Sequence, residues 1–302
     1  MFSKKEKKNR IKTKPEKRQL MRSWLFVAPS LIGVTLFFGA PFLVVIWYSM
    51  VNNPVQHRFV GLQNFIRVSS NEAYRLASLN TMRFSFIAVP LAVFLSLAVA
   101  LIMEAEIPKK SLFRSCLLSP MMVPVASIVL IWQVLFHYNG LVNESMIKLF
   151  GTARIDWLKS EYAPIVIVLL FIWKNLGYNM ILFMSALASI PKDLIEVARI
   201  EGSSDLRIFF TIRLRYISST ILFVAIMSLL NSFKVFRETY LMTGEYPFDS
   251  LYLLQHFMNN TFLSLDYQKL SAAAIMMSVV IVVIVGILVY TEDRFGRDLD
   301  EA

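Results

Sequence analysis

The sequence predicts an all-α membrane protein with six transmembrane helices, cytoplasmic termini and a short cytoplasmic helix between the fourth and fifth spans. Of its 302 residues, 56% belong to the apolar AVILMFWYC set and only 17% are charged, whereas soluble domains carry about 25% charged residues. Its uncharged runs reach the roughly 20 residues that a helix needs to cross a ~30 Å hydrocarbon core. Because barrel strands are only about 10 residues long, runs of this length exclude a β-barrel.

Six apolar segments have the length of a membrane span. The first contains Pro29 and Pro41, which we expect to kink the helix or to mark its ends. The fourth contains a single charge, Lys174. The expected spans are residues 24–50, 84–103, 112–136, 164–189, 217–237 and 270–290.

Lysine and arginine are unevenly distributed over this predicted topology. Ten of the 31 lie within residues 1–22. With the N-terminus inside, the cytoplasmic segments hold 20, the outer segments nine and the spans two. Because cytoplasmic loops carry an excess of these residues, we predict that both termini are inside. The predicted organisation is a basic arm at 1–23, a six-helix domain at 24–290 and a tail at 291–302.

The basic arm could also belong to a signal peptide or be a nucleic-acid-binding tail, but the residues that follow it disfavour both interpretations. A signal peptide would end at a small-residue cleavage pattern, but the apolar run from Ser23 exceeds 30 residues without one. A nucleic-acid-binding tail is less typical of a basic segment that continues directly into an apolar run. We therefore expect a retained first span with membrane lipid as a partner, and no nucleic acid.

The sequence lacks the residues that several types of functional site require. One cysteine, Cys116, excludes an intramolecular disulfide, and the three histidines have no metal-ligand spacing. The sequence has no G-x-x-x-x-G-K-[ST] phosphate loop. A membrane-embedded enzyme would need clustered His, Cys or acidic residues, and an ion-coupled secondary transporter would need intramembrane acids. No Asp or Glu falls within any expected span, so both alternatives are disfavoured.

A polar segment of 27 residues, 190–216, separates the fourth and fifth expected spans. Asp193 and Glu196 have the spacing of a capping box, which predicts a short helix over about 194–201 with Leu194, Val197 and Ala198 toward one side. Gly202 fits the left-handed position just past the helix. Ser203 or Ser204 can then cap a second helix, which carries Leu206, Phe209, Phe210 and Ile212 toward the bilayer and Arg207, Arg213 and Arg215 toward headgroups. Two interpretations stay open: a docking element, or a cytoplasmic loop lying on the membrane surface.

Short motifs occur in a fixed order around the expected spans. They are Phe59–Phe65, Leu79–Thr81, Leu112–Arg114, Ile190–Leu194 leading into Glu196-Val197-Ala198 and Glu201-Gly202-Ser203 with Ile212 and Leu214, and Ser232–Phe236. Together they resemble the permease subunits of bacterial ABC-type importers with an "EAA" signature, in the maltose- and glycerol-phosphate-type first-permease branch of carbohydrate uptake. The resemblance covers about residues 20–295.

The chain departs from that family pattern at a few positions. Val197, Glu201 and Ser203 replace residues of similar size or charge. Arg215 stands where the family usually has a proline, which leaves the angle between the docking element and the fifth span open. The family's T-G-G-P reads Thr243–Pro247 here, within an outer loop at 238–269 that is interpreted as a lid or a receptor contact.

The resemblance implies that the short helix inserts into a cleft of a separate ATPase subunit. The implied coupling residues are Glu196, Val197, Ala198, Glu201, Gly202 and Ser203. It also implies a second homologous permease, an ATPase dimer, an extracytoplasmic solute-binding protein and a bacterial cytoplasmic membrane. This chain would be no enzyme and would hold no cofactor, since ATP and Mg would be bound by the partner ATPase.

The resemblance also implies a carbohydrate path inside the bundle. The candidate residues are Tyr178, Asn179, Asn231, Ser232, Lys174 and Lys234, with Trp132 and Gln133 as weaker candidates. Lys174 either lines the path or is a structural lysine that snorkels or pairs with a neighbouring subunit. Tyr178 either stacks on a sugar face or only packs the helix. Asn231 is the best candidate, because its amide offers a donor and an acceptor to a hydroxyl.

Overall fold

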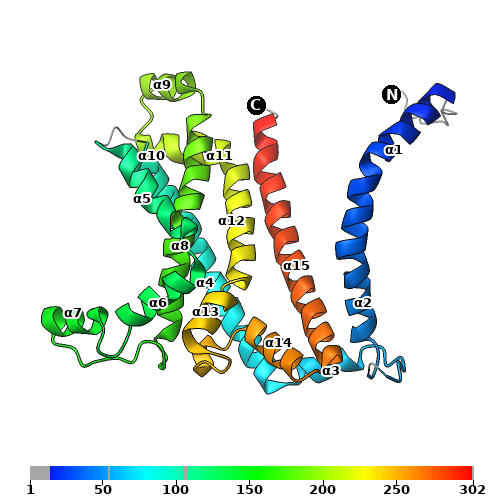
Figure 1. Ribbon diagram of the computed structural model, residues 1–302. Coiled ribbons are helices and arrows are strands. Elements are labelled where there is room, and N and C mark those ends of the chain that lie inside the picture. The colour runs from blue at the N-terminus through cyan, green and yellow to red at the C-terminus, as the bar shows by residue number, and fades with distance from the viewer. Residues whose placement is uncertain (1–13, 54, 105–107, 301–302) are drawn as a thin grey trace.

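The computed structural model describes residues 14–53, 55–104 and 108–300 (Figure 1). Within these ranges the regular secondary structure is helical, and β structure is limited to an isolated bridge between Val51 and Phe59. The predicted all-α class is confirmed. Most of the predicted N-terminal arm and the last two residues of the predicted tail lie outside the described residues.

The helical elements follow one another with short connections. In chain order they are α1 (Lys14–Val34), the π-helix η1 (Thr35–Gly39), α2 (Ala40–Ser49), α3 (Gln63–Ser69), α4 (Glu72–Ile102), α5 (Lys110–Met122), α6 (Val125–Leu135), α7 (Leu141–Phe150), α8 (Ala163–Ala188), α9 (Lys192–Ile200), α10 (Asp205–Ile208), the π-helix η2 (Phe209–Arg213), α11 (Leu214–Tyr216), α12 (Ser218–Phe233), α13 (Phe236–Thr243), the 3-10 helix η3 (Asp249–Leu251), α14 (Leu254–Leu263) and α15 (Tyr267–Asp300).

Five helical runs are long and apolar enough to cross a membrane by themselves. They are Trp24–Ser49, Glu72–Ile102, Ala163–Ala188, Ser218–Thr243 and Tyr267–Glu292. A sixth crossing is obtained when the bent pair α5 and α6 is counted as one broken span. The structure therefore accommodates the six predicted spans, five of them as unbroken or gently interrupted runs.

The sequence predicts a continuous third span over residues 112–136. In the structure this span is broken into two helices. Helices α5 and α6 meet at 101°. Pro124 has no N–H to donate to the preceding turn, and it restricts Val123 to an extended conformation, with φ −83° and ψ 135°. The chain therefore turns sharply at this dipeptide, and α6 packs against α13.

Two span boundaries differ from those predicted. Helix α4 begins at Glu72 rather than at residue 84, because the side chain of Asn71 caps its first turn by accepting from the backbone N–H of Tyr74 at 3.1 Å. The fifth candidate span extends to Thr243 and contains Glu238. Glu238 follows the expected end of this span, residue 237, by one position.

The first span combines three helical segments. Pro29 lies inside α1, and Pro41 lies in the first turn of α2, directly after the π-helix η1. A π-turn rearranges the backbone hydrogen bonds where a proline cannot donate one. The span packs through α2 against α15, and its most apolar window is not buried within the described chain.

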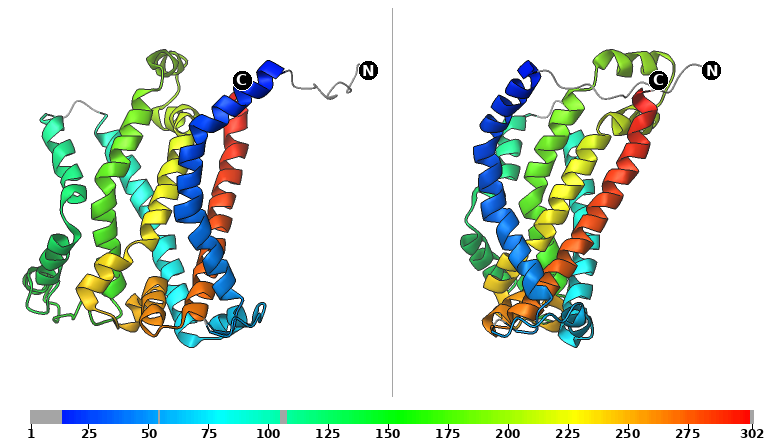
Figure 2. Two further views of the ribbon diagram at one scale, coloured as in Figure 1. Left: turned by 45° about the vertical axis from the view of Figure 1, so that its right-hand side comes forward. Right: turned by 90° about the vertical axis from the view of Figure 1, so that its right-hand side faces the viewer.

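Helices α4, α8 and α12 pack together in the middle of the bundle (Figure 2). Helix α5 lies against α8 at Gly177, where an added Cβ would meet the backbone oxygen of Leu117 at 2.0 Å. Only glycine permits this close backbone approach. The arrangement places α9, the beginning of α1 and the end of α15 at one end of the molecule, and α3, α7, α13 and α14 at the other (Figure 1).

Candidate functional site

The polar segment between α8 and α12 forms the short helix α9 at one end of the bundle. The helix runs from Lys192 to Ile200 rather than over 194–201, and Pro191 precedes it in an extended conformation. No side chain caps its N-terminus, so the predicted capping box of Asp193 and Glu196 is wrong. Asp193 lies instead in the first turn, where its negative charge favours the helix dipole.

The C-terminus of α9 has the complete hydrogen-bond pattern of a Schellman motif. The N–H of Gly202 donates to the carbonyl of Arg199 at 3.0 Å, and the N–H of Ser203 donates to that of Ala198 at 2.9 Å. Gly202 has a φ of +83°, which confirms the predicted left-handed position. Nothing lies within 4 Å of the position that its Cβ would take, so this turn is open to the surroundings.

The outer surface of α9 is apolar and exposed. Val197 is 53% exposed and Ile200 is 86% exposed, and Leu194 is exposed beside them. Ala198 is buried, and Ile195 packs against the core between α4, α8 and α12. Of the three residues expected on one side of this helix, Leu194 and Val197 are exposed and Ala198 is buried. The remaining predicted coupling residues, Glu196, Glu201, Gly202 and Ser203, lie along the accessible part of this segment.

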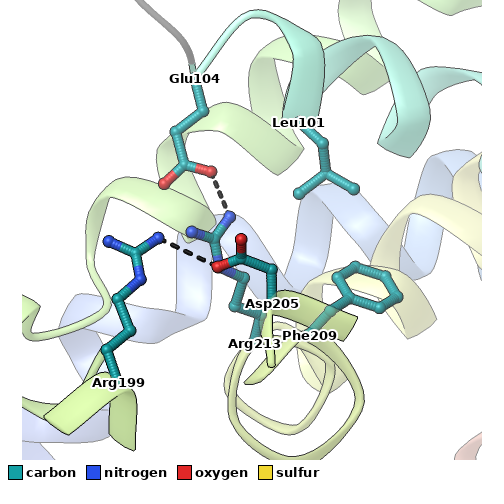
Figure 3. Close-up of a pocket in the computed structure, with 6 residues that line it drawn as sticks. All are labelled: Leu101, Glu104, Arg199, Asp205, Phe209 and Arg213. Atoms are coloured by element: carbon teal, nitrogen blue, oxygen red, sulfur yellow. Dashed lines mark hydrogen bonds and ion pairs between the residues drawn. The ribbon is translucent and has the colours of Figure 1, made fainter. Parts of the chain in front are cut away.

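One ion pair lies within this segment, and a second joins the segment to the end of α4. Arg199 binds Asp205 at 3.1 Å, and Arg213 binds Glu104 at the end of α4 at 2.5 Å (Figure 3). Together with Leu101 and Phe209 these four residues line a cleft of about 350 Å³. Arg213 thus does not face headgroups as predicted, since its side chain is only 19% exposed and is held by the carboxylate.

The second short helix confirms part of the predicted capping. The hydroxyl of Ser204, not that of Ser203, accepts from the backbone N–H of Arg207 at 3.4 Å and caps α10. Leu206 and Phe210 are exposed, and Phe209 packs inward. With Arg215 in place of a proline, the helical path continues to Tyr216, and the break before α12 falls at the buried Ile217.

A second candidate site is a cavity of about 460 Å³ in the interior of the bundle. It lies where α8, α12 and α13 meet the break between α5 and α6. Its lining is formed by Met121, Val123, Val125, Leu170, Phe171, Lys174, Asn175, Tyr178, Met227, Asn231, Lys234, Val235, Arg237 and Glu238. Apolar side chains and a few convergent polar groups are typical of a small-molecule site.

The charge of Lys174 is neutralised inside this chain. Its ammonium forms an ion pair with the carboxylate of Glu238, which is 5% exposed. Lys174 lies on α8 and Glu238 on α13, 64 residues later. Sequence reasoning missed Glu238 because it follows the expected end of the fifth span by one residue. The signal that could have found it is Lys174 itself, since an intramembrane charge requires a partner.

The predicted path residues divide into two groups. Lys174, Tyr178, Asn231 and Lys234 line the cavity, and the amide of Asn231 donates to Asn175 at 3.0 Å. Asn179 and Ser232 are buried outside this lining, where they hydrogen-bond Ser228 at 3.0 Å and Ser85 at 2.8 Å. Gln133, a weaker candidate, donates to the backbone oxygen of Met242 at 2.9 Å. A role of any of these residues in transport stays a prediction.

The fold and these two sites define an integral membrane permease with an interior cavity and an exposed apolar helix between its fourth and fifth spans. Residues 92–297 match the family model of the binding-protein-dependent transport system inner membrane component, and the chain belongs to this family. The sequence resemblance to ABC importer permeases is thereby confirmed, and the ion-coupled alternative is set aside.

Curated relatives match over most of their lengths. The chain is 28% identical over 295 residues to the trehalose/maltose transport system permease protein MalF of Thermococcus litoralis, covering 96% of this chain and 99% of the relative. It is 30% identical over 265 residues to the sn-glycerol-3-phosphate transport system permease protein UgpA of Yersinia pestis, covering 86% and 90%.

A solved structure shares the fold. It is a bacterial ABC transporter involved in the import of the acidic polysaccharide alginate, with a TM-score of 0.79 and 20% identity, and it covers 93% of this chain and 99% of that one. A second structure of a bacterial alginate ABC transporter, in complex with a periplasmic protein bound to an alginate pentasaccharide, has the same TM-score.

Proposed function

We propose that this chain is one of two permease subunits that form the path of an ATP-driven carbohydrate importer. A single observation carries the proposal: α9 is an outwardly apolar helix, closed by a Schellman motif at its C-terminus, between the two spans that line the cavity. Such a helix can pass a movement of a docked subunit into α8 and α12. Membership in a binding-protein-dependent family supports the same role.

The partner at α9 would be an ATPase subunit on the cytoplasmic side. Leu194, Val197 and Ile200 supply an apolar contact area, and the open turn at Gly202 would leave room for a neighbouring surface. ATP and Mg would be bound by that partner, not by this chain. The basic sequence at the N-terminus supports this orientation, and so does the position of α9 at the same end of the bundle as the beginning of α1 and the end of α15.

The opposite end of the bundle would receive a solute-binding protein, and a second homologous permease would complete the path. Relatives that transport trehalose, maltose and glycerol phosphate support a carbohydrate or carbohydrate-like solute. The cavity suits such a solute, because Asn175 and Asn231 offer amides to hydroxyl groups and Tyr178 offers an aromatic face.

The coupling role is tested by cross-linking and by one substitution. Val197→Cys, in a Cys116→Ser background that removes the exposed native thiol, should cross-link to the ATPase in membranes. Gly202→Asp should abolish transport and substrate-stimulated ATP turnover, while the amount of protein in the membrane stays unchanged. Transport by the chain alone, or full transport by Gly202→Asp, would contradict the proposal.

A further inference from the structure

The charged groups of the interior cavity do not balance. Lys174, Lys234, Arg237 and Glu238 all line it. The buried carboxylate of Glu238 forms an ion pair with the ammonium of Lys174, so these two charges neutralise each other. Among the described residues this pair is the only ion pair of the cavity. Two cationic side chains are therefore left over.

Lys234 and Arg237 lie on one turn of the chain. Lys234 directly follows the last residue of α12, and Arg237 lies in the first turn of α13. The backbone N–H of Arg237 donates to the carbonyl of Lys234 at 3.4 Å. Both residues are exposed, and neither forms an ion pair with a described residue. Side chains three positions apart on a turn are neighbours, and two like charges in such positions repel each other. An anion between them would relieve that repulsion.

The uncharged part of the lining points to a polyhydroxylated ligand. The amide of Asn231 donates one hydrogen bond to Asn175 and keeps its oxygen and a second N–H for a ligand. Tyr178 adds an aromatic side chain beside them, and Leu170 and Phe171 close the apolar side. An inorganic anion would bind Lys234 and Arg237 but would make no use of the aromatic and amide side chains beside them.

We propose that the cavity selects an acidic carbohydrate, with a carboxylate or phosphate group held by Lys234 and Arg237 and its hydroxyl groups held by Asn231 and Asn175. This inference rests on the proposed carbohydrate importer. Glu238 sets the selectivity indirectly: by neutralising Lys174 it leaves the cationic charge at the turn between α12 and α13.

The inference is tested on the complete importer in proteoliposomes, with its own binding protein. Uptake and ATP turnover are measured with an oligogalacturonate, glycerol phosphate and a neutral glucose oligosaccharide. The first two probes distinguish a carboxylate from a phosphate. The variants are Lys234→Gln and Arg237→Gln, and the controls are Lys159→Gln and Arg67→Gln, which remove exposed cations from outside the cavity.

We expect at least one acidic probe to stimulate turnover. We expect each cavity variant to raise the KM for that probe about tenfold, because it removes one charge-assisted contact with the acidic group. Lys234→Arg should restore most of the loss, and the controls should leave the KM unchanged.

Two results would overturn the inference and leave the proposed function intact. One is stimulation by the neutral oligosaccharide but by neither acidic probe. The other is an unchanged KM for an acidic probe in both cavity variants. Stimulation by none of the three probes would contradict the carbohydrate proposal together with the inference.

Discussion

Gly177 allows the backbone of α5 to lie directly against α8. A Cβ at this position would approach the backbone oxygen of Leu117 to 2.0 Å, far inside contact distance. Because the obstacle is backbone, a side-chain rotation cannot relieve it. The two helices would have to separate, and the break at Val123 and Pro124 that borders the cavity would move with α5.

Gly177→Ala is therefore expected to lower the thermal unfolding midpoint of the purified protein clearly, with a loss of at least about 2 kcal/mol from overpacking. The matched control is Gly286→Ala in α15, where nothing lies within 4 Å of the added Cβ. That change should be neutral or slightly stabilising, because alanine favours a helix more than glycine does. Equal midpoints for the two variants would show that α5 does not approach α8 as described.

His256 is a fully buried residue at the end of the bundle opposite α9. Its Nδ1 accepts from the backbone N–H of Leu253 at 3.2 Å, and its Nε2 has no partner among the described residues. Its ring lies edge-to-face with Phe236, 4.8 Å between ring centroids. Burial disfavours the imidazolium and lowers the pKa of His256 from 6.5 to about 4.

This lowered pKa predicts a stability that depends on pH. Between pH 6.5 and about 4 the unfolded chain binds a proton that the folded chain excludes, so the free energy of unfolding should fall as the pH decreases through this window. The full loss would be of order 3 kcal/mol. Unfolding midpoints measured at pH 7 and pH 4.5 should differ less in His256→Gln than in the original protein, and an identical difference would contradict the assignment.

At the scale of elements, the connection between α9 and the bundle depends on the ion pair of Arg213 with Glu104. It joins the segment after α9 to the end of α4, which packs against α8 and α12. Arg213 is mostly buried while Glu104 is more exposed, so the pair matters more for position than for global stability.

Arg213→Gln is accordingly expected to reduce substrate-stimulated ATP turnover of the complete importer several-fold, while basal turnover and the unfolding midpoint change little. Arg207→Gln is the matched control, because Arg207 lies six residues earlier in the same segment and forms no ion pair with a described residue. The assay compares turnover with and without the loaded binding protein. If the Arg213→Gln variant kept its substrate-stimulated ATP turnover, the connection between α9 and the bundle would depend on apolar packing alone.

The elements also differ in how far the sequence predicts them. Apolar run length locates the spans well, because the bilayer core imposes a length on any crossing helix. It does not locate their polar ends: Glu72, Arg75 and Arg83 continue α4 outside the apolar run, where hydropathy cannot distinguish helix from loop. Gly202 was predictable because a left-handed turn selects one residue type.

Other features depend on tertiary contacts that no local pattern encodes. Glu238 matters because Lys174 approaches it from 64 residues away, and Ala198 faces inward because α9 leans on the core beside α4 and α8. The bend at Pro124 was visible as a proline, but its angle of 101° depends on how α6 packs. Four residues that line the cavity were therefore predictable from the sequence. The ion pair that neutralises Lys174 was not.

At the scale of the whole molecule, the beginning of α1, the end of α15 and α9 lie at one end of the bundle (Figure 1). An even number of crossings is required for this arrangement, and the broken pair α5 and α6 supplies the sixth. If this pair were re-entrant and did not cross, α8 and every later element would change sides relative to α1. The side on which α9 lies therefore depends on the sixth crossing.

Cysteine accessibility tests this topology directly. In a Cys116→Ser background, Val197→Cys in α9 should react with a membrane-impermeant maleimide only after cells are permeabilised. Lys159→Cys, between α7 and α8, and Arg67→Cys, in α3, should react in intact cells, since all three positions are exposed. Labelling of residue 67 but not of residue 159 from outside would mean that α5 and α6 enter and leave on one side. Such a result would place α9 outside, where no ATPase could reach it.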